Sequence, residues 1–197
     1  QSFVEMGVTP QNVYGMTENS SHHYTWPNDP QDTICESCGR GGKAYQLKIF
    51  DPENPDIEML QGEVGHIAGK GACLMLGYFD NQKATEESFN KDGWFLSGDL
   101  GLIDADGCLR FVGRLKDIII RGGKNIHPKK IEDLAIKHPN VEKAAAFPVP
   151  DERLGERVCL AVLSTGSEPE GQDVLGHLFG HGLSIYDMPE YYMVMTE

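Results

Sequence analysis

The sequence has few basic side chains and lacks any long apolar run. It holds 17 Lys and Arg against 30 Asp and Glu, a formal net charge of −13, which argues against nucleic-acid binding by bulk attraction. No stretch approaches the roughly 20 apolar residues that a membrane-spanning helix needs, and no charged-then-apolar leader opens the sequence. We therefore expect a cytoplasmic protein without a transmembrane segment and without a nucleic-acid partner.

Cysteine is also scarce, and its five residues are scattered. Cys35 and Cys38 have the spacing of a metal or redox pair, but no second pair or well-spaced Cys/His set accompanies them. The adjacent His22 and His23 lack the i, i+4 spacing of a helical metal pair. We predict that all the thiols are reduced and that His22 and His23 lie in a solvated loop.

What the chain does have is enough apolar material for a core, with 40% hydrophobic residues over 197 positions. In the first part, alternating apolar residues predict strands at 45–50, 64–68 and 108–112, separated by turn-forming segments. A Glu- and Lys-rich segment predicts a helix at 81–89, capped by Asp80 or Asn81. Short strands with turns between them favour a small barrel or sandwich.

The second part alternates strands with helices. The pattern predicts strands at 118–120, 141–147, 158–163 and 191–194 and helices at 128–137 and 172–180. Residues 1–113 carry a net charge of −10 and residues 114–197 a net charge of −3. The fold class that we predict is α+β. Near Arg114 the net charge becomes less negative and the strand-rich pattern gives way to one of alternating strands and helices.

A cationic segment follows directly after this change. Six of the 17 residues from Arg114 to Lys130 are Lys or Arg, and only Asp117 is acidic. Such a segment in an acidic protein either meets a phosphate-bearing or acidic partner or consists of scattered, solvated lysines.

Three motifs occur in a fixed order along the chain. They are Val13–Asn19 (VYGMTEN), Gly93–Leu100 (GWFLSGDL) and Gly113–Pro128 (GRLKDIIIRGGKNIHP). Together they resemble the adenylate-forming (AMP-binding) superfamily of the acyl-CoA synthetase type. The resemblance implies that residues 1–113 are the β-rich, barrel-like end of a large N-terminal domain, that residues 114–117 are a hinge, and that residues 118–197 form a small, mobile α+β C-terminal domain.

The implied chemistry activates a carboxylic acid with ATP, and a thiol then attacks the acyl-adenylate. It needs a platform for adenine, an acceptor for ribose hydroxyls, cations for phosphate and a Mg²⁺ ligand. In the first motif the Tyr14 ring offers a stacking face and Gly15 a close backbone approach. The Thr17 hydroxyl can hold a phosphate oxygen, and Glu18 is an oxygen ligand for Mg²⁺. Without the other motifs, the same residues would be a loop with a capping threonine.

The second and third motifs complete the predicted nucleotide site. A carboxylate at Asp99, which we expect between two strands, can accept both ribose hydroxyls, and its alternative role is to cap a turn. The planar fork of Arg114 suits the adenylate. The resemblance makes Lys116 the pivot of the hinge.

The remaining predicted contacts are to CoA. Gly122 and Gly123 can admit the thin pantetheine arm or adopt positive φ. Lys124, with Lys129 and Lys130, is a candidate for the phosphates of CoA. The family often carries an acidic residue at the position of Lys130.

We thus predict an ATP-dependent acid–thiol ligase, an acyl-CoA synthetase acting on a medium-chain or cyclic acid such as cyclohexanecarboxylate. A peptide-synthetase-type adenylation domain is the alternative, and a non-catalytic nucleotide- or CoA-binding module is a third interpretation. The family's Gly/Ser/Thr-rich phosphate loop and its late Gly-Lys lysine are not found, and the sequence begins with Gln1. We expect an inactive fragment whose partner is the remainder of its own N-terminal domain.

Overall fold

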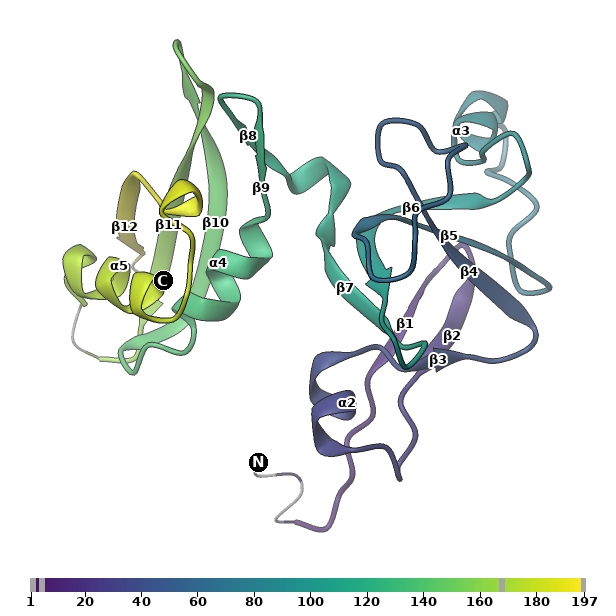
Figure 1. Cartoon of the computed structure of the whole chain (residues 1–197), viewed down its shortest axis with the longest axis horizontal. Coiled ribbons are helices and arrows are strands. Elements are labelled where there is room, and N and C mark those ends of the chain that lie inside the picture. Colours follow the sequence, from purple (N-terminus) through teal and green to yellow (C-terminus); the bar gives the residue numbers. More distant parts are fainter. Residues whose placement is uncertain (1–2, 4–5, 167–168, 196–197) are drawn as a thin grey trace. The chain divides into compact units, whose positions relative to one another are not determined.

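The computed structural model describes residue 3 and residues 6–166 and 169–195 (Figure 1). The chain divides into two compact units, Gln1–Leu115 and Lys116–Glu197, called the first and the second unit below. A short 3₁₀ turn, Leu115–Asp117, lies at the division. Both units combine helices with strands. No helix in the described ranges is both long and apolar enough to cross a membrane.

The first unit is built from two antiparallel sheets. One sheet has the order β1-β2-β3 and the other the order β4-β5-β6-β7. The strands are β1 (Val13–Met16), β2 (Ser20–Tyr24), β3 (Arg40–Gly41), β4 (Tyr45–Phe50), β5 (Gly65–Gly71), β6 (Phe95–Ile103) and β7 (Leu109–Arg114). The helices are α2 (Gln31–Glu36) and α3 (Gln82–Glu87).

The core of the first unit follows from the alternation of side chains along β4 and β5. Ile49 faces Ile67 in the ladder, and both pack with Leu109 in one cluster of buried residues. Phe50 and Ala68 pack with Trp94 in a second cluster. The four-stranded sheet is therefore covered on both faces, since successive side chains of a strand point to opposite sides.

Of the small barrel or sandwich that the sequence predicted, a closed barrel is wrong. Among the described residues, the path β4-β5-β6-β7 does not close, because its edge strands β4 and β7 do not pair. The segment around Glu58 takes the free edge of β4 instead: the Met59 amide donates to the Ile49 carbonyl (2.8 Å) and the Asp51 amide to the Ile57 carbonyl (2.9 Å). An edge satisfied in this way needs no closure.

The second unit consists of one sheet with two helices. Its strands are β8 (Ile119–Arg121), β9 (Lys124–Ile126), β10 (Val141–Asp151), β11 (Gly155–Ser164) and β12 (Tyr191–Met195), and its helices are α4 (Pro128–Ala135) and α5 (Gly171–Gly180). The order is β10-β11-β8-β9, and β12 runs parallel to β11. A 3₁₀ turn, Ile185–Asp187, precedes β12.

Both helices of the second unit contribute to one core. Ile131 and Ala135 of α4 and Val174 and Leu178 of α5, each pair four residues apart, are buried with the apolar residues of the strands. Residues four apart lie on one face of a helix. In Figure 1, α4 and α5 accordingly lie on the same side of the sheet.

Most predicted elements are present, with shifted ends. The predicted helix at 81–89 is α3, and Asn81 is its cap, since its side chain accepts from the Ala84 amide (3.1 Å). The predicted strand at 141–147 extends to Asp151 through Pro148 and Pro150. Prolines are tolerated there because β10 is an edge strand.

Several elements were not predicted. The hairpin β1–β2, helix α2 and strand β9 have no clear apolar period in the sequence. Asp99, expected between two strands, lies inside β6. The Ser97-Gly98 pair looks like a turn in the sequence, but it is accommodated as an irregularity within a continuous strand.

Candidate functional site

The first and second motifs meet at Asp99. The Tyr14 hydroxyl, on β1, donates to Asp99 Oδ2 at 2.8 Å. Arg114 lies opposite Asp99 in the β6–β7 ladder, and its Nε is 3.9 Å from Asp99 Oδ1. Tyr14 and Asp99 are each 8% exposed, whereas the Arg114 side chain is 60% exposed. The structure thus brings together three predicted nucleotide-binding residues from three strands.

The surroundings of Tyr14 keep its hydroxyl protonated. Its ring contacts the His22 ring edge-on at 5.6 Å between centroids and the Phe111 ring at 6.5 Å. Burial raises the pKa of Tyr14 far above its usual range, and the negative charge of Asp99 adds to this effect. Tyr14 is therefore a permanent donor to Asp99, and its role as a stacking platform stays a prediction.

The turn between β1 and β2 presents Thr17 and Glu18. Thr17 is exposed and Glu18 is half-buried. The Tyr78 hydroxyl donates to Glu18 Oε1 (3.0 Å), and the Met75 amide donates to the Glu18 carbonyl (2.7 Å). The predicted phosphate and metal residues therefore lie side by side in a turn whose backbone is held from outside the hairpin.

Asn19 anchors this turn, a role that sequence reasoning missed. Its side chain is 2% exposed, accepts from the Met16 amide (3.0 Å) and donates to the Tyr45 hydroxyl (3.0 Å). The Cys73 thiol donates to its carbonyl (3.0 Å). The only available signal was the tendency of Asn to bond to nearby backbone in turns.

Gly15 is required by the hairpin itself. A Cβ at this position would lie 2.1 Å from the Ser20 carbonyl oxygen and 2.6 Å from the Ser21 Cα. The β1–β2 register shifts between Tyr14 and Gly15. The close approach that we predicted toward a ligand is thus, in this structure, an approach to the backbone of β2.

The prediction of a solvated loop at His22 and His23 is wrong. Both lie on β2 and are 6% and 5% exposed. Their Nδ1 atoms are 2.7 Å apart, so that one donates to the other, and the His22 ring stacks on Tyr45 at 4.0 Å. Burial lowers the pKa of each to about 4. The SSHHY segment has no apolar alternation, so only the packing of the hairpin could reveal this burial.

In the second unit, the glycine pair forms the tip of the β8–β9 hairpin. Gly122 and Gly123 are exposed, with φ of 59° and 81°. A Cβ on Gly123 would meet no atom within 4 Å, so the positive φ, rather than lack of space, is what favours glycine there. The tip therefore offers bare backbone at the surface of this unit.

Arg121, Lys124 and Lys130 of the basic segment have acidic partners. Lys124 Nζ is 2.7 Å from Asp187 Oδ1, and Lys130 Nζ is 3.6 Å from Asp187 Oδ2. Lys124 also lies 5.2 Å from the centre of the Tyr186 ring. Arg121 is 2.6 Å from Glu190 and donates to the Tyr186 and Met188 carbonyls. The basic segment thus holds the 186–190 segment in place.

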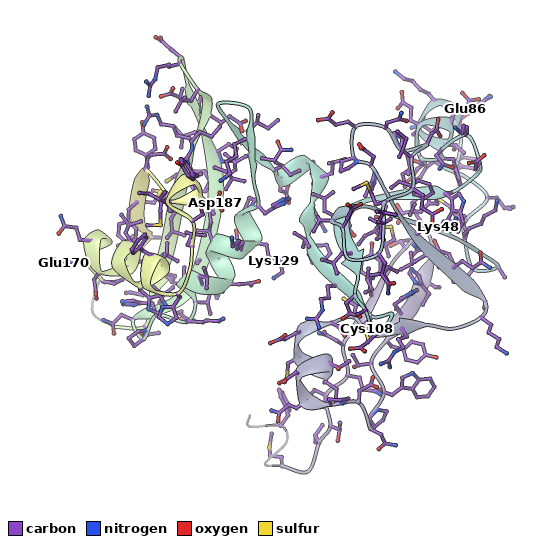
Figure 2. All side chains as sticks on the ribbon, in the orientation of Figure 1. Lys48, Glu86, Cys108, Lys129, Glu170 and Asp187 are labelled. Atoms are coloured by element: carbon purple, nitrogen blue, oxygen red, sulfur yellow. The ribbon has the colours of Figure 1, made fainter. Side chains whose placement is uncertain are left out.

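Two predicted lysines lie outside this network. Lys129 pairs with Asp133, one turn further along α4, at 3.0 Å. Figure 2 shows Lys129 on α4 and Asp187 on the turn before β12. Lys116, the predicted pivot, is exposed in the turn Leu115–Asp117.

All five cysteines are free thiols, and Cys108 and Cys159 are buried. Across residue 3 and residues 6–166 and 169–195, no group of three or more His, Cys, Asp or Glu side chains is arranged to hold a metal ion.

Comparison with known proteins finds relatives that include medium-chain acyl-CoA ligases. Residues 2–79 match the family model described as AMP-binding enzyme. The chain is 36% identical over 183 residues to the mitochondrial medium-chain acyl-CoA ligase ACSF2 of Mus musculus, covering 91% of this chain and 29% of the relative. It is 31% identical over 195 residues to the medium-chain fatty-acid–CoA ligase of Escherichia coli, covering 98% and 34%.

A solved structure agrees with these relatives. ATP-bound MatB from Rhodopseudomonas palustris superposes with a TM-score of 0.89 at 31% identity, over 97% of this chain and 37% of that protein. The chain spans about a third of the length of the curated relatives that it matches. The order of the three motifs and these similarities agree, and the chain belongs to the family of AMP-binding, adenylate-forming enzymes of the acyl-CoA synthetase type.

Proposed function

We propose that this chain is part of an AMP-forming acyl-CoA ligase. In the proposed reaction, a carboxylate oxygen attacks the α-phosphorus of ATP and pyrophosphate leaves. The sulfur of CoA then attacks the acyl carbon, AMP leaves, and the thiol proton passes to solvent. The observation that carries the proposal is the meeting of Tyr14, Asp99 and Arg114 from separate motifs.

Asp99 is the proposed acceptor for the ribose hydroxyls. A carboxylate can accept from both hydroxyls of a ribose, and the Tyr14 hydroxyl donates to Asp99 Oδ2 at 2.8 Å. Arg114, mostly exposed beside Asp99, has the planar fork that suits an adenylate oxygen. The family role of the Tyr14 ring is to stack on adenine.

Glu18 and Thr17 are the proposed residues at the metal and phosphate. Mg²⁺ is held in such enzymes by one or two carboxylates together with substrate phosphates and water. A half-buried Glu18 with one oxygen bonded to Tyr78, beside the exposed Thr17, fits that requirement. When bound, the metal would neutralise charge on the phosphates, and Thr17 would orient a phosphate oxygen.

CoA is the proposed thiol substrate, and the second unit is its proposed partner. The exposed Gly122-Gly123 backbone suits a thin pantetheine arm, with Lys124 beside it. We also propose residues 1–113 and 118–197 as domains and 114–117 as the hinge, with Lys116 as pivot. The division of the chain between Leu115 and Lys116 supports this layout.

The acid is proposed to be of medium chain length, in line with the named activities of the mouse and E. coli relatives. The test is acid-dependent exchange of pyrophosphate into ATP by the whole protein, across linear acids and cyclohexanecarboxylate, followed by thioester formation. We expect exchange and an acyl-CoA product. Exchange without transfer to CoA, but with transfer to a carrier phosphopantetheine, would contradict the choice of thiol. No exchange with any acid would overturn the proposal.

Residues 1–197 alone are expected to bind nucleotide or CoA only weakly and not to catalyse exchange, since they span about a third of the length of their relatives. Acyl-adenylate formation by these residues would contradict that expectation. A cytoplasmic location stays part of the proposal, and fractionation of cells that express the protein tests it.

A further inference from the structure

Strand β6 is irregular directly before Asp99. Ala68 of β5 faces Leu96, and His66 faces Leu100. Three residues of β6, 97–99, therefore stand opposite the single residue Ile67. Gly98 has a φ of 79°, a conformation that favours glycine. This bulge displaces Asp99 from the position that a regular strand would give it.

Side chains replace the ladder hydrogen bonds that the bulge removes. The Ser97 hydroxyl donates to the Ile67 carbonyl (2.7 Å) and accepts from the Asp99 amide (3.1 Å). The Gly98 amide donates to His66 Nε2 at 2.8 Å. His66 is thus the one side chain from β5 that binds the backbone of the bulge in the described residues, and it is 7% exposed.

The hydrogen bond from Gly98 determines the tautomer of the His66 imidazole. Because the Gly98 amide is a donor, His66 Nε2 must carry a lone pair, and the ring proton of the neutral form must lie on Nδ1. The cross-strand neighbours of His66 are Phe50 and Leu100, both apolar and buried. Burial lowers the pKa of His66, which favours this neutral form.

We propose that His66 is a positioning residue of the nucleotide site. By accepting from Gly98 it holds the bulge that presents Asp99 to Tyr14 and to a ribose. The identity of the ligand as a nucleotide rests on the proposed function. The geometry rests on the contacts of His66, Gly98 and Asp99 described above. His66 itself touches no ligand in this scheme and acts through Gly98 and Asp99.

The test compares two amide replacements of different length. In His66→Gln, the side-chain oxygen reaches the place of Nε2, whereas in His66→Asn the same group is one methylene shorter and cannot reach Gly98. Calorimetry measures binding of AMP and of 2′,3′-dideoxy-AMP, which lacks the ribose hydroxyls. We expect about tenfold weaker AMP binding for His66→Asn, the effect of one misplaced charge-assisted contact. We expect a change within about twofold for His66→Gln and unchanged dideoxy-AMP binding for both.

The outcomes separate the inference from the proposed function. If the unsubstituted protein does not prefer AMP over its dideoxy analogue, the ribose role of Asp99 is wrong. If it does, but His66→Asn binds AMP as tightly as the unsubstituted protein, the positioning role is wrong. If His66→Asn binds AMP and 2′,3′-dideoxy-AMP equally weakly relative to the unsubstituted protein, His66 has only a structural role. That result would also overturn the inference.

A measurement without any nucleotide decides the geometry separately. The ¹⁵N shifts of the His66 ring should show an unprotonated Nε2, and the Gly98 amide should exchange with solvent slowly. Exchange should be faster in His66→Asn and slow again in His66→Gln. A protonated Nε2, or Gly98 exchange that neither substitution changes, would contradict the proposal even if the protein bound no nucleotide.

Discussion

The two units differ in how the predicted functional residues find their partners. In the first unit, Tyr14, Asp99 and Arg114 are far apart in the sequence and lie together in the structure. In the second unit, Arg121, Lys124 and Lys130 are close in the sequence, and each contacts the 186–190 segment. The motif residues of the first unit thus come together from separate strands. The neighbouring cations of the second unit are instead each paired with an acidic side chain, Asp187 or Glu190. Charge counted along a chain is therefore not charge available to a ligand.

The substitution with the largest expected effect tests whether the two units unfold independently, because it truncates a core side chain of only one of them. Ile131 is fully buried in the second unit, and Ile131→Ala should cost about 3 kcal/mol of its unfolding free energy. Urea unfolding followed by far-UV circular dichroism measures the loss. Both tryptophans, Trp26 and Trp94, lie in the first unit, so their fluorescence transition should stay in place. An equal shift of both transitions would show that the units unfold together.

The convergence in the first unit can be broken at its centre. Asp99→Asn removes the charge that accepts from Tyr14 and faces Arg114. In the whole protein it should lower kcat/KM for ATP about 100-fold, as expected for losing two charge-assisted hydrogen bonds. Asp106→Asn is the matched control, because Asp106 is exposed in the β6–β7 turn. Similar losses for both substitutions would remove the special role of Asp99.

The buried histidine pair makes the stability of the first unit depend on pH. The pKa of His22 and His23 falls from 6.5 to about 4 on folding, so the unfolded chain binds more protons between these values. Stability is fully present above pH 6.5 and is lost as pH falls toward 4. The loss between pH 7 and pH 5 should be about 2 kcal/mol for each of the two histidines.

Urea unfolding followed by tryptophan fluorescence measures this dependence. Replacing both histidines by Gln should remove most of the difference between pH 7 and pH 5. The control is His181→Gln, an exposed histidine of the second unit, which should leave it unchanged. If the difference in stability between pH 7 and pH 5 is unchanged in the double variant, groups other than His22 and His23 cause it.

The smallest expected effect concerns the divided charges of the second unit. Asp187→Asn releases Lys124 and Lys130 from their shared carboxylate and should tighten CoA binding about threefold at low salt. Glu142→Gln removes one negative charge from an exposed position of β10, away from the three lysines predicted to meet CoA, and serves as the matched control. Calorimetry with CoA and with dephospho-CoA, which lacks the 3′-phosphate, measures the effect. Equal tightening by both substitutions would mean that only net charge matters.

The sequence predicts well where a local rule decides. Pro128 begins α4 and Asn81 caps α3, as expected from the preferences of helix ends. The alternation of 45–50 predicts β4 at the same bounds. The three motifs also led to the family, which the comparisons confirm. In each case the information lies within a few neighbouring residues.

The sequence predicts poorly where pairing partners are distant. His22 and His23 look polar, and only their packing against Tyr45 and the rest of the first unit buries them. A small barrel or sandwich was predicted from the short strands and turns. Whether a sheet closes depends on what pairs with its edge strands, and the segment around Glu58 pairs with β4. The role of Asn19 likewise depends on Tyr45, 26 residues away.

The sequence by itself determined the family and the residue types of the candidate site. It also determined the change in net charge and in the pattern of strands and helices near Arg114. Only the tertiary structure decided that Tyr14 donates to Asp99, that the Gly98 amide donates to His66, and that Asp187 pairs with Lys124 and Lys130. The physical reason is that residue type and local spacing are properties of a segment. Hydrogen bonds and ion pairs at 2.5–4 Å need two segments in one place, and that placement comes from burial of the core as a whole.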